Sequence, residues 1–285
     1  MNLNLYNLHT HSKFCDGSGE PEEYIVSAIE KNFHTLGFSS HAPVPFQNKF
    51  AIKDEEELQE YCKTVRNLQE KYQSRILICL GLEADYIQGV SRDFAAFRQS
   101  YDLDYIIGSV HLVKNADDPR LWFIDGSKVE TYSEGLENIF GGDVRKAITA
   151  FYRQQIQMLN TQKVDIIGHF DKIKMHNRNR YFKEDESWYR ELVMELVETI
   201  EKKEIIVEVN TRGIYKKRSE DLYPGQWILK ILNEKNIPIT LSADAHKPQE
   251  VDGFYPETIE MLRNIGYKSL VYFSGGSWRE QEISF

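Results

Sequence analysis

Short apolar runs alternate with longer amphipathic stretches along the chain. The runs are rich in Ile, Leu, Val or Tyr and lie close to Gly, Ser or Asn, which is typical of buried parallel strands. They cover Leu3–Leu8, Thr35–Ser40, Arg75–Leu82, Asp104–Val110, Val164–Gly168, Ile205–Val209, Ile237–Leu241 and Ser269–Phe273. Apolar residues at helical spacing predict helices over Glu20–Asn32, Glu55–Tyr72, Arg145–Leu159 and Ser187–Lys203. Because strand and helix alternate seven times, the pattern favours a parallel α/β barrel over an open sheet.

No internal repeat, low-complexity segment or Pro/Gly/Ser-rich linker divides the sequence, so we expect a single domain over residues 1–285. The longest gap between predicted strands separates Val110 from Val164. We expect an insert at about residues 112–145 that covers the carboxyl-terminal rim of the barrel. Trp122 and Phe123 in this insert either pack over a substrate ring or form a small core of the insert itself.

Ionisable side chains gather where the predicted strands end. Six of the eight histidines do so, together with two acidic residues and one turn: His9, His11, His41, Glu83, His111, His169, Asn210-Thr211-Arg212, Asp244 and His246. In α/β barrels the catalytic groups come from the carboxyl ends of different strands. Seven consecutive strand ends therefore predict one polar site at the rim.

The residue types suit a metal site. Imidazoles combined with carboxylates favour Zn, Mn, Fe or Co over Ca or Mg, which prefer oxygen ligands alone. In an extended strand, residues i and i+2 point to the same side, so His9 and His11 can share one cation, and Asp244 and His246 have the same spacing. One carboxylate of Glu83 could bridge two metals. A structural role is favoured for any single histidine, but not for the whole set.

Three further ionisable residues lie outside this set. His34 lies between a predicted helix and a predicted strand, and we expect a surface or capping role for it. His176 stays unassigned, and Asp85 has either a supporting role behind the site or a surface role.

The ordered motifs resemble the PHP (polymerase and histidinol phosphatase) family over residues 9 to about 250. They are His9-Thr10-His11 followed by Asp16, Ser40-His41, Gly81-Leu82-Glu83, Gly108-Ser109-Val110-His111, Gly168-His169 and Ser242-Ala243-Asp244-Ala245-His246. The resemblance implies a distorted (β/α)7 barrel of the TIM type that holds two to three divalent transition metals. It places three ligand sets: His9, His11, Glu83 and Asp244; Glu83, His111 and His169; and Asp16, His41 and His246. Some relatives have histidine where this chain has Asp16, and the aspartate adds negative charge at that position.

Within the family, the chain looks most like the histidinol-phosphate phosphatase branch. The features that carry this likeness are the stand-alone length, Gly108-Ser109-Val110-His111, Asn210-Thr211-Arg212-Gly213 and Trp122-Phe123-Ile124-Asp125. The resemblance implies a phosphomonoesterase that hydrolyses L-histidinol phosphate to L-histidinol and phosphate in histidine biosynthesis. A metal-bound hydroxide would attack phosphorus, and the leaving group would be protonated either by a metal-bound water or by Asp244 or His246 in a second role.

Charge arithmetic is consistent with a phosphate ester as the small-molecule substrate. Three dications and the carboxylates of Asp16, Glu83 and Asp244 leave a site charge of about +3, which suits a phosphate dianion. Arg212 is predicted to bind the phosphate through two parallel hydrogen bonds, with a structural ion pair as the alternative. Arg178 is a weaker candidate for substrate binding, because its basic run either lines the pocket mouth or is merely solvated.

Composition limits the partners and the cellular location that we expect for the protein. The net charge of −9 argues weakly against a nucleic-acid partner, which would demand a basic face. No apolar run is long enough to span a membrane, and Met1–Leu8 has no signal-peptide pattern. Three cysteines without paired spacing predict a cytoplasmic location. The sequence does not predict an oligomeric state.

Three rival functions remain at this point. One is another PHP phosphoesterase that acts on nucleotides, nucleic-acid ends or phosphotyrosine. A second is a metal-binding module without catalysis, although every ligand position of the family pattern is filled. The third is a barrel of the amidohydrolase type, which usually relies on a lysine bridging ligand or a different histidine order.

Overall fold

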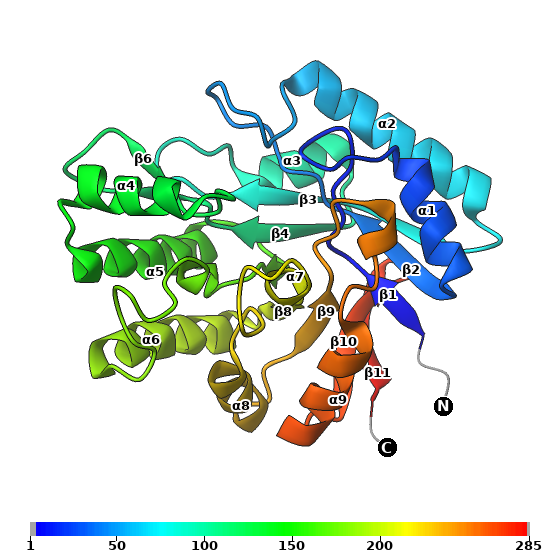
Figure 1. The fold of residues 1–285 in the computed structure, drawn as a ribbon. Helices are drawn as coiled ribbons and strands as arrows, with labels where there is room; N and C mark the ends of the chain where they lie inside the picture. Colours follow the sequence, from blue (N-terminus) through cyan, green and yellow to red (C-terminus); the bar gives the residue numbers. More distant parts are fainter. Residues whose placement is uncertain (1–3, 284–285) are drawn as a thin grey trace.

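Seven parallel strands form the core of the computed structural model, which describes residues 4–283 (Figure 1). Their order around the sheet is β1-β2-β3-β4-β7-β8-β9. Their bounds are β1 Leu5–Asn7, β2 Phe33–Phe38, β3 Leu77–Asp85, β4 Tyr105–Ser109, β7 Ile166–Ile167, β8 Ile206–Asn210 and β9 Ile239–Ser242. A parallel bridge between Thr10 and Ala245, just beyond β1 and β9, joins the two edges of the sheet. The predicted distorted barrel is confirmed; Leu3, in the first predicted strand, lies outside the described residues.

Helices surround this barrel (Figure 1). They are α1 Pro21–Glu30, α2 Glu55–Tyr72, α3 Phe94–Tyr101, α5 Val144–Thr161, α6 Ser187–Lys203, α7 Arg212–Tyr215, α8 Gln226–Glu234 and α9 Tyr255–Ile265, with 3₁₀ turns η1 Lys172–Lys174 and η2 Pro248–Glu250. The predicted bounds of α2 and α6 are confirmed to the residue. Asp54 begins α2, because its side chain accepts a hydrogen bond from the backbone N–H of Glu57 at 3.0 Å.

The ring of Tyr105 fills the barrel interior. It is fully buried, and its hydroxyl donates to the backbone carbonyls of Leu8 at 2.5 Å and Phe38 at 3.1 Å. Glycines face the ring: a Cβ at Gly37 or Gly81 would lie 2.3 or 2.5 Å from its nearest atom. Glycine at these two strand positions therefore makes room for an aromatic plug, and the barrel is a packed core rather than a pore.

The chain leaves the barrel after β4 and returns at α5. This insert contains the antiparallel strands β5 (Leu112–Lys114) and β6 (Leu121–Phe123) and helix α4 (Val129–Phe140). Figure 1 shows α4 and β6 beyond the arrowheads of β3 and β4, which mark the carboxyl ends of those strands. Trp122 is fully buried, and its Nε1 donates to the carbonyl of Tyr132 at 3.0 Å. Trp122 thus belongs to a small core of the insert.

One predicted strand has a different role from the one expected. Residues Ser269–Phe273 were grouped with the parallel strands, and this was wrong. Within residues 4–283, β10 (Ser269–Ser274) pairs only with β11 (Ser277–Glu282), and the pairing is antiparallel. Gly275 and Gly276, with φ of 60° and 76°, form the two-residue turn that reverses the chain.

No helix in the described part of the chain is both long enough and apolar enough to cross a membrane.

Candidate metal centre

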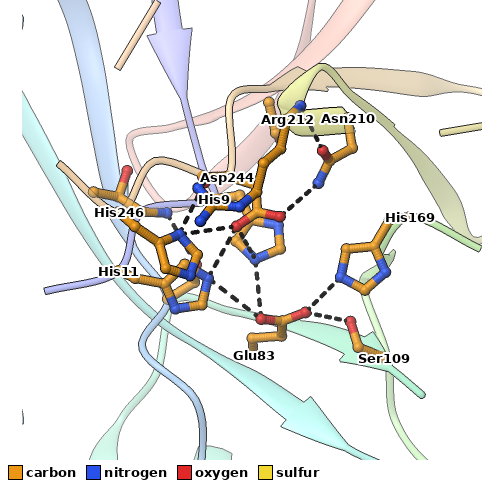
Figure 2. Close-up of polar contacts among 12 residues, drawn as sticks. His9, His11, Glu83, Ser109, His169, Asn210, Arg212, Asp244 and His246 are labelled. Carbon is orange, nitrogen blue, oxygen red and sulfur yellow. Dashed lines mark hydrogen bonds and ion pairs between the residues drawn. The ribbon is translucent and has the colours of Figure 1, made fainter. Parts of the chain in front are cut away.

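The structure brings the predicted ionisable residues together at one rim of the barrel (Figure 2). Most of them follow a strand, as expected, but Glu83 does not. Strand β3 continues through Asp85, and Glu83 and Asp85 pair with Ile107 and Ser109 of β4. Because Glu83 and Asp85 are two residues apart in one strand, both side chains point to the same side, toward the histidines.

The first donor set contains His9, His11, Glu83 and Asp244. Oε2 of Glu83 lies 3.1 Å from Nε2 of His9 and 3.4 Å from Nε2 of His11. Oδ1 of Asp244 lies 3.9 and 3.3 Å from the same two nitrogens. Two imidazole nitrogens and two carboxylate oxygens therefore face one point, as four ligands of a single cation would.

The second donor set uses the other oxygen of Glu83. Oε1 lies 2.9 Å from Nε2 of His169 and 3.6 Å from Nε2 of His111, and the two nitrogens are 3.2 Å apart. The hydroxyl of Ser109 donates to the same oxygen at 2.6 Å. The Glu83 carboxylate thus lies between two groups of imidazoles, the geometry of a bridging ligand (Figure 2).

A third donor set lies on the more open side of the site. Oδ1 of Asp16 is 3.2 Å from Nε2 of His246 and 3.9 Å from Nε2 of His41. Asp244 has a φ of 51°, so this segment is not the extended strand that the spacing assumed. Both side chains still reach the site: Oδ1 of Asp244 lies 3.3 Å from Nε2 of His11 and 3.4 Å from Nδ1 of His246. Nε2 of His246 faces Asp16.

Two buried carboxylates fix the rear nitrogens of the histidine rings. Glu208 is fully buried, and its Oε1 lies 2.5 Å from Nδ1 of His9. Its Oε2 accepts from the backbone N–H of His169 at 2.8 Å. Asp85 lies 2.9 Å from Nδ1 of His111 and also accepts from the backbone N–H of that residue. Such partners set the ring orientation and leave the other nitrogen, Nε2, facing the site.

Unpaired buried atoms test whether these residues fit metal ions. Nε2 of His9, Nε2 of His11 and Nδ1 of His41 are all buried without a hydrogen-bond partner. A buried polar atom left unpaired costs free energy, and a cation would accept these lone pairs. Among the described residues, donor atoms of four triads lie within 4.8 Å of one another: His9, His11 and Asp244; His9, Glu83 and His169; His11, Asp16 and His41; and His41, Glu83 and His111. The residues fit a metal centre.

Nearby carboxylate charges raise the pKa values of the imidazoles, and burial lowers them. Burial lowers the pKa of His9, but the charges of Glu208, Glu83 and Asp244 outweigh it and hold this pKa well above its usual value. Burial likewise opposes protonation of His111, yet Asp85 and Glu83 raise its pKa to about 9. In His41 burial dominates and lowers the pKa to about 4. The carboxylate charge that raises two of these pKa values is also what attracts a cation.

The site opens into a cavity of about 640 Å³. The rings of Phe50 and Phe123 stack in its wall, with centroids 5.8 Å apart. Arg212 lines this cavity and is largely buried, and its Nη1 donates to the backbone carbonyl of Asp244 at 2.8 Å. Arg178 lines a separate depression beside the cavity.

A buried ion pair at the site was not foreseen. Nζ of Lys172 lies 2.9 Å from Oδ2 of Asp125 and 4.0 Å from Oδ2 of Asp244. Asp125 comes from the insert, and the same oxygen is 3.8 Å from Nε2 of His111. Lys172 follows the predicted ligand His169 by three residues, and nothing in the surrounding sequence distinguishes it from a surface lysine.

The two remaining histidines lie away from the donor sets. His34 is exposed within β2, so its predicted surface position is confirmed, although the strand begins one residue before it. His176 is half-buried, and its Nε2 lies 2.6 Å from the carbonyl of Gly126.

Comparisons with known proteins agree with this geometry. The PHP domain family matches residues 7–212. The chain is 26% identical over 271 residues to the probable histidinol-phosphatase of Deinococcus radiodurans, covering 94% of this chain and 96% of the relative. It is 26% identical over 266 residues to the histidinol-phosphatase of Bacillus subtilis, covering 88% and 97%.

A solved structure shares the fold. It is the histidinol phosphate phosphatase of Lactococcus lactis subsp. lactis, complexed with zinc, L-histidinol and phosphate. The TM-score is 0.68 at 21% identity, with 98% of this chain and 100% of that chain covered. The family match spans well over half of the sequence and includes most of the donor residues, and so the chain belongs to the PHP domain family.

Proposed function

We propose that this protein is a metal-dependent phosphomonoesterase that hydrolyses L-histidinol phosphate to L-histidinol and phosphate, a step of histidine biosynthesis. The observation that carries the proposal is the Glu83 carboxylate, whose two oxygens face two separate groups of buried imidazoles beside a cavity that Arg212 lines. The curated relatives named histidinol-phosphatase and the L. lactis complex with L-histidinol and phosphate support the choice of substrate. We expect the enzyme to act in the cytoplasm, where the free cysteines Cys15, Cys62 and Cys79 persist.

The proposed ligands form three sets that share Glu83 between two of them. His9, His11, Glu83 and Asp244 would hold one cation, Glu83, His111 and His169 a second, and Asp16, His41 and His246 a third. Mixed nitrogen and oxygen donors favour Zn, Mn, Fe or Co. Bound divalent cations would neutralise the phosphoryl oxygens and lower the pKa of a water to about 7.

The protein's own side chains would bind and orient the ester. Nη1 of Arg212 is held by the carbonyl of Asp244, which fixes the guanidinium at the cavity wall, where it would bind phosphate oxygens. Asp244 and His246 are the proposed groups for proton transfer to the leaving oxygen. Arg178 remains a proposed substrate contact, from the depression beside the cavity.

The cavity also has features that suit the organic part of the substrate. The stacked rings of Phe50 and Phe123 give the cavity wall an aromatic surface on which an imidazole could pack. Asp125 lines the same cavity, and its Oδ1 has no hydrogen-bond partner and would accept from a protonated amine. We infer that the insert, which supplies Phe123 and Asp125, contributes to recognition of histidinol.

Phosphate release measures this function directly. Protein reconstituted separately with Mn, Zn, Fe and Co would be given histidinol phosphate, and nucleotides, phosphotyrosine and p-nitrophenyl phosphate in parallel. We expect kcat/KM for histidinol phosphate to exceed the others by about 100-fold or more. Glu83→Gln, which removes the bridging charge, is expected to be inactive. Activity on the other esters but not on histidinol phosphate would contradict the proposed substrate. Inactivity on every ester with metals bound would contradict the proposal that the protein is a phosphatase.

A further inference from the structure

A second basic pocket adjoins the catalytic cavity. It is a depression of about 650 Å³ whose charged walls are Lys128, Arg178, Arg180, Lys217 and Arg218, with Glu130 as the one acidic lining residue. We call it the basic depression. The whole chain has a net charge of −9, so five cations against one carboxylate reverse the sign of the protein's charge at this place.

Most of this positive charge is not neutralised by the protein. Within residues 4–283, the side chains of Lys128, Arg178, Lys217 and Arg218 form no ion pair or hydrogen bond, whereas other exposed cations such as Lys71 do so. Like charges that gather without counter-ions repel one another, and an anion placed among them would relieve the repulsion.

The walls of the basic depression are held in place. Asn177 is buried, and its Oδ1 accepts from the backbone N–H groups of Tyr181 at 3.0 Å and Phe182 at 3.2 Å. His176 contacts the carbonyl of Gly126 at 2.6 Å and so ties this loop to the insert. Arg178 has a φ of 41°, a conformation that a non-glycine residue holds only when its surroundings impose it. Arg178 and Arg180 therefore project from an ordered loop.

The basic depression continues into the catalytic cavity. Ser127 and Arg218 line both spaces. Arg212, the proposed phosphate contact, lines the catalytic cavity but not the depression. The exposed Arg178 thus lines the depression, the half-buried Arg218 lines both spaces, and the buried Arg212 lines the cavity.

We propose that the basic depression is a second, weaker anion site that holds the phosphate group of a phosphomonoester dianion, or inorganic phosphate, on its path between solvent and the metal centre. This inference rests on the proposed phosphatase function for the identity of the ester. The field of such a cleft raises the local concentration of anions and is screened by salt, because the Debye length is about 8 Å at physiological ionic strength. The basic depression would bind the phosphate ester weakly and raise its rate of encounter with the protein, and the metal centre would hydrolyse it.

The test compares two triple variants of the metal-loaded enzyme. Lys128→Gln/Arg178→Gln/Lys217→Gln removes three cations of the depression and leaves Arg218 and Arg212 in place. Lys163→Gln/Lys230→Gln/Lys268→Gln is the matched control, because these lysines are exposed and two of them lie toward the amino-terminal ends of the barrel strands: Lys163 precedes β7, and Lys268 lines a depression beside the start of β9. We expect KM for histidinol phosphate to rise on the order of 10-fold in the first variant with kcat nearly unchanged. We also expect KM to depend less on NaCl concentration than in the wild type and the control.

Two further measurements separate this inference from the substrate assignment. Inhibition by L-histidinol, which has no phosphate, is expected to be equal in all three proteins. Calorimetric titration with inorganic phosphate is expected to show a weak, salt-sensitive binding event that the first variant loses and the control keeps. This event needs no turnover, so it is observed even if histidinol phosphate is not the substrate.

Three results would overturn the inference. They are an equal rise in KM in both variants, a salt dependence unchanged by loss of the three cations, and retention of the weak phosphate event in the first variant. Binding of a single-stranded oligonucleotide that depends on the same cations, with KM unaffected, would reassign the depression to a different partner.

Discussion

The rear nitrogens of the imidazole rings at the rim have dedicated partners. Nδ1 of His9 faces Glu208, Nδ1 of His111 faces Asp85, and Nδ1 of His246 lies 3.0 Å from the carbonyl of Asp244. A hydrogen bond at Nδ1 fixes the tautomer and turns the lone pair of Nε2 toward the site. Metal affinity therefore depends on residues that do not themselves face a cation.

Glu208→Gln tests this dependence at a single residue. The substitution keeps the side-chain size but removes the charge that holds His9, so we expect metal affinity to fall about 10- to 100-fold. Activity at limiting Mn²⁺ should drop and return when Mn²⁺ is in excess, because Glu208 positions a ligand and does not touch the substrate. Metal titration followed by phosphate release measures both effects.

The matched control is Glu198→Gln, an exposed glutamate on α6. It should leave metal affinity at the wild-type value. Unchanged metal affinity in Glu208→Gln, or a loss of activity that excess Mn²⁺ does not restore, would contradict the positioning role.

At this scale the sequence predicted the residues of the rim better than their partners. The histidines and Asp244 follow strand ends, and Glu83 lies two residues before the end of β3, so the barrel geometry makes them converge. Glu208 was counted inside an apolar strand, although a charged residue in a buried parallel strand must be paired and was itself a signal. Asp85 had two open interpretations, because nothing in the sequence shows that β3 continues two residues beyond Glu83 into the site.

The insert is the element that distinguishes this barrel from a plain one. Strands β5 and β6 and helix α4 pack around Trp122, whose ring also contacts Tyr132 and Phe140. The same β6 supplies Phe123 to the cavity, and Asp125 follows it. Packing inside the insert therefore determines where two cavity residues lie.

Gly135→Ala tests this coupling. Alanine favours a helix by about 1 kcal/mol over glycine, but a Cβ at Gly135 would lie 2.1 Å from Cδ1 of Trp122. The steric clash with Trp122 should outweigh the gain in helix propensity. We therefore expect the free energy of unfolding to fall by about 1–3 kcal/mol and KM for histidinol phosphate to rise. Thermal denaturation and steady-state kinetics measure the two effects.

Gly126→Ala serves as the comparison within the same insert. Its added Cβ would meet Thr131 at 3.5 Å, an ordinary contact, so stability should change by less than about 0.5 kcal/mol. Equal stability of the two variants would show that α4 and β6 shift apart without cost.

Local rules explain why some elements were predicted and others were not. Helices α2 and α6 have long apolar stripes, so their bounds follow from periodicity. Strand β10 has the composition of a barrel strand, and only the pair Gly275-Gly276 after it indicates a hairpin. Residue type alone therefore does not tell a barrel strand from a hairpin strand, and the local turn decides the pairing.

Charge at the metal centre affects the stability of the whole molecule. The pKa of His9 is raised by Glu208, Glu83 and Asp244 against the effect of burial, and that of His111 is raised to about 9 mainly by Asp85. In the unfolded chain both rings titrate near 6.5. The folded, metal-free protein therefore holds more protons than the unfolded chain between pH 6.5 and 9, and its stability falls as the pH rises through this window.

EDTA-treated protein is thus expected to melt at a lower temperature at pH 9 than at pH 6.5. The shift of His111 alone corresponds to about 3 kcal/mol, or on the order of 5 °C in Tm for a chain of this size. His41, with its pKa lowered to about 4, is neutral in both states above pH 6.5 and does not oppose the trend.

Metal-loaded protein should show the opposite trend. Metals bind deprotonated imidazoles, so protons compete with them and the stabilisation by Mn²⁺ grows with pH. Tm measured with EDTA and with Mn²⁺ at both pH values gives the difference. A difference that is constant or shrinks toward pH 9 would contradict the proposed ligand set.

The bridge between Thr10 and Ala245 joins segments near opposite ends of the chain, and the flanking residues of both segments supply donors to the same centre. A ribosome releases His9 and His11 long before Asp244 and His246. The growing polypeptide consequently completes the set of Glu83, His111 and His169 first, and completes the two sets that need Asp244 or His246 only after the last barrel strand, β9. Full loading with metal therefore requires β9, and a truncated product lacking this strand cannot retain a full complement of ions.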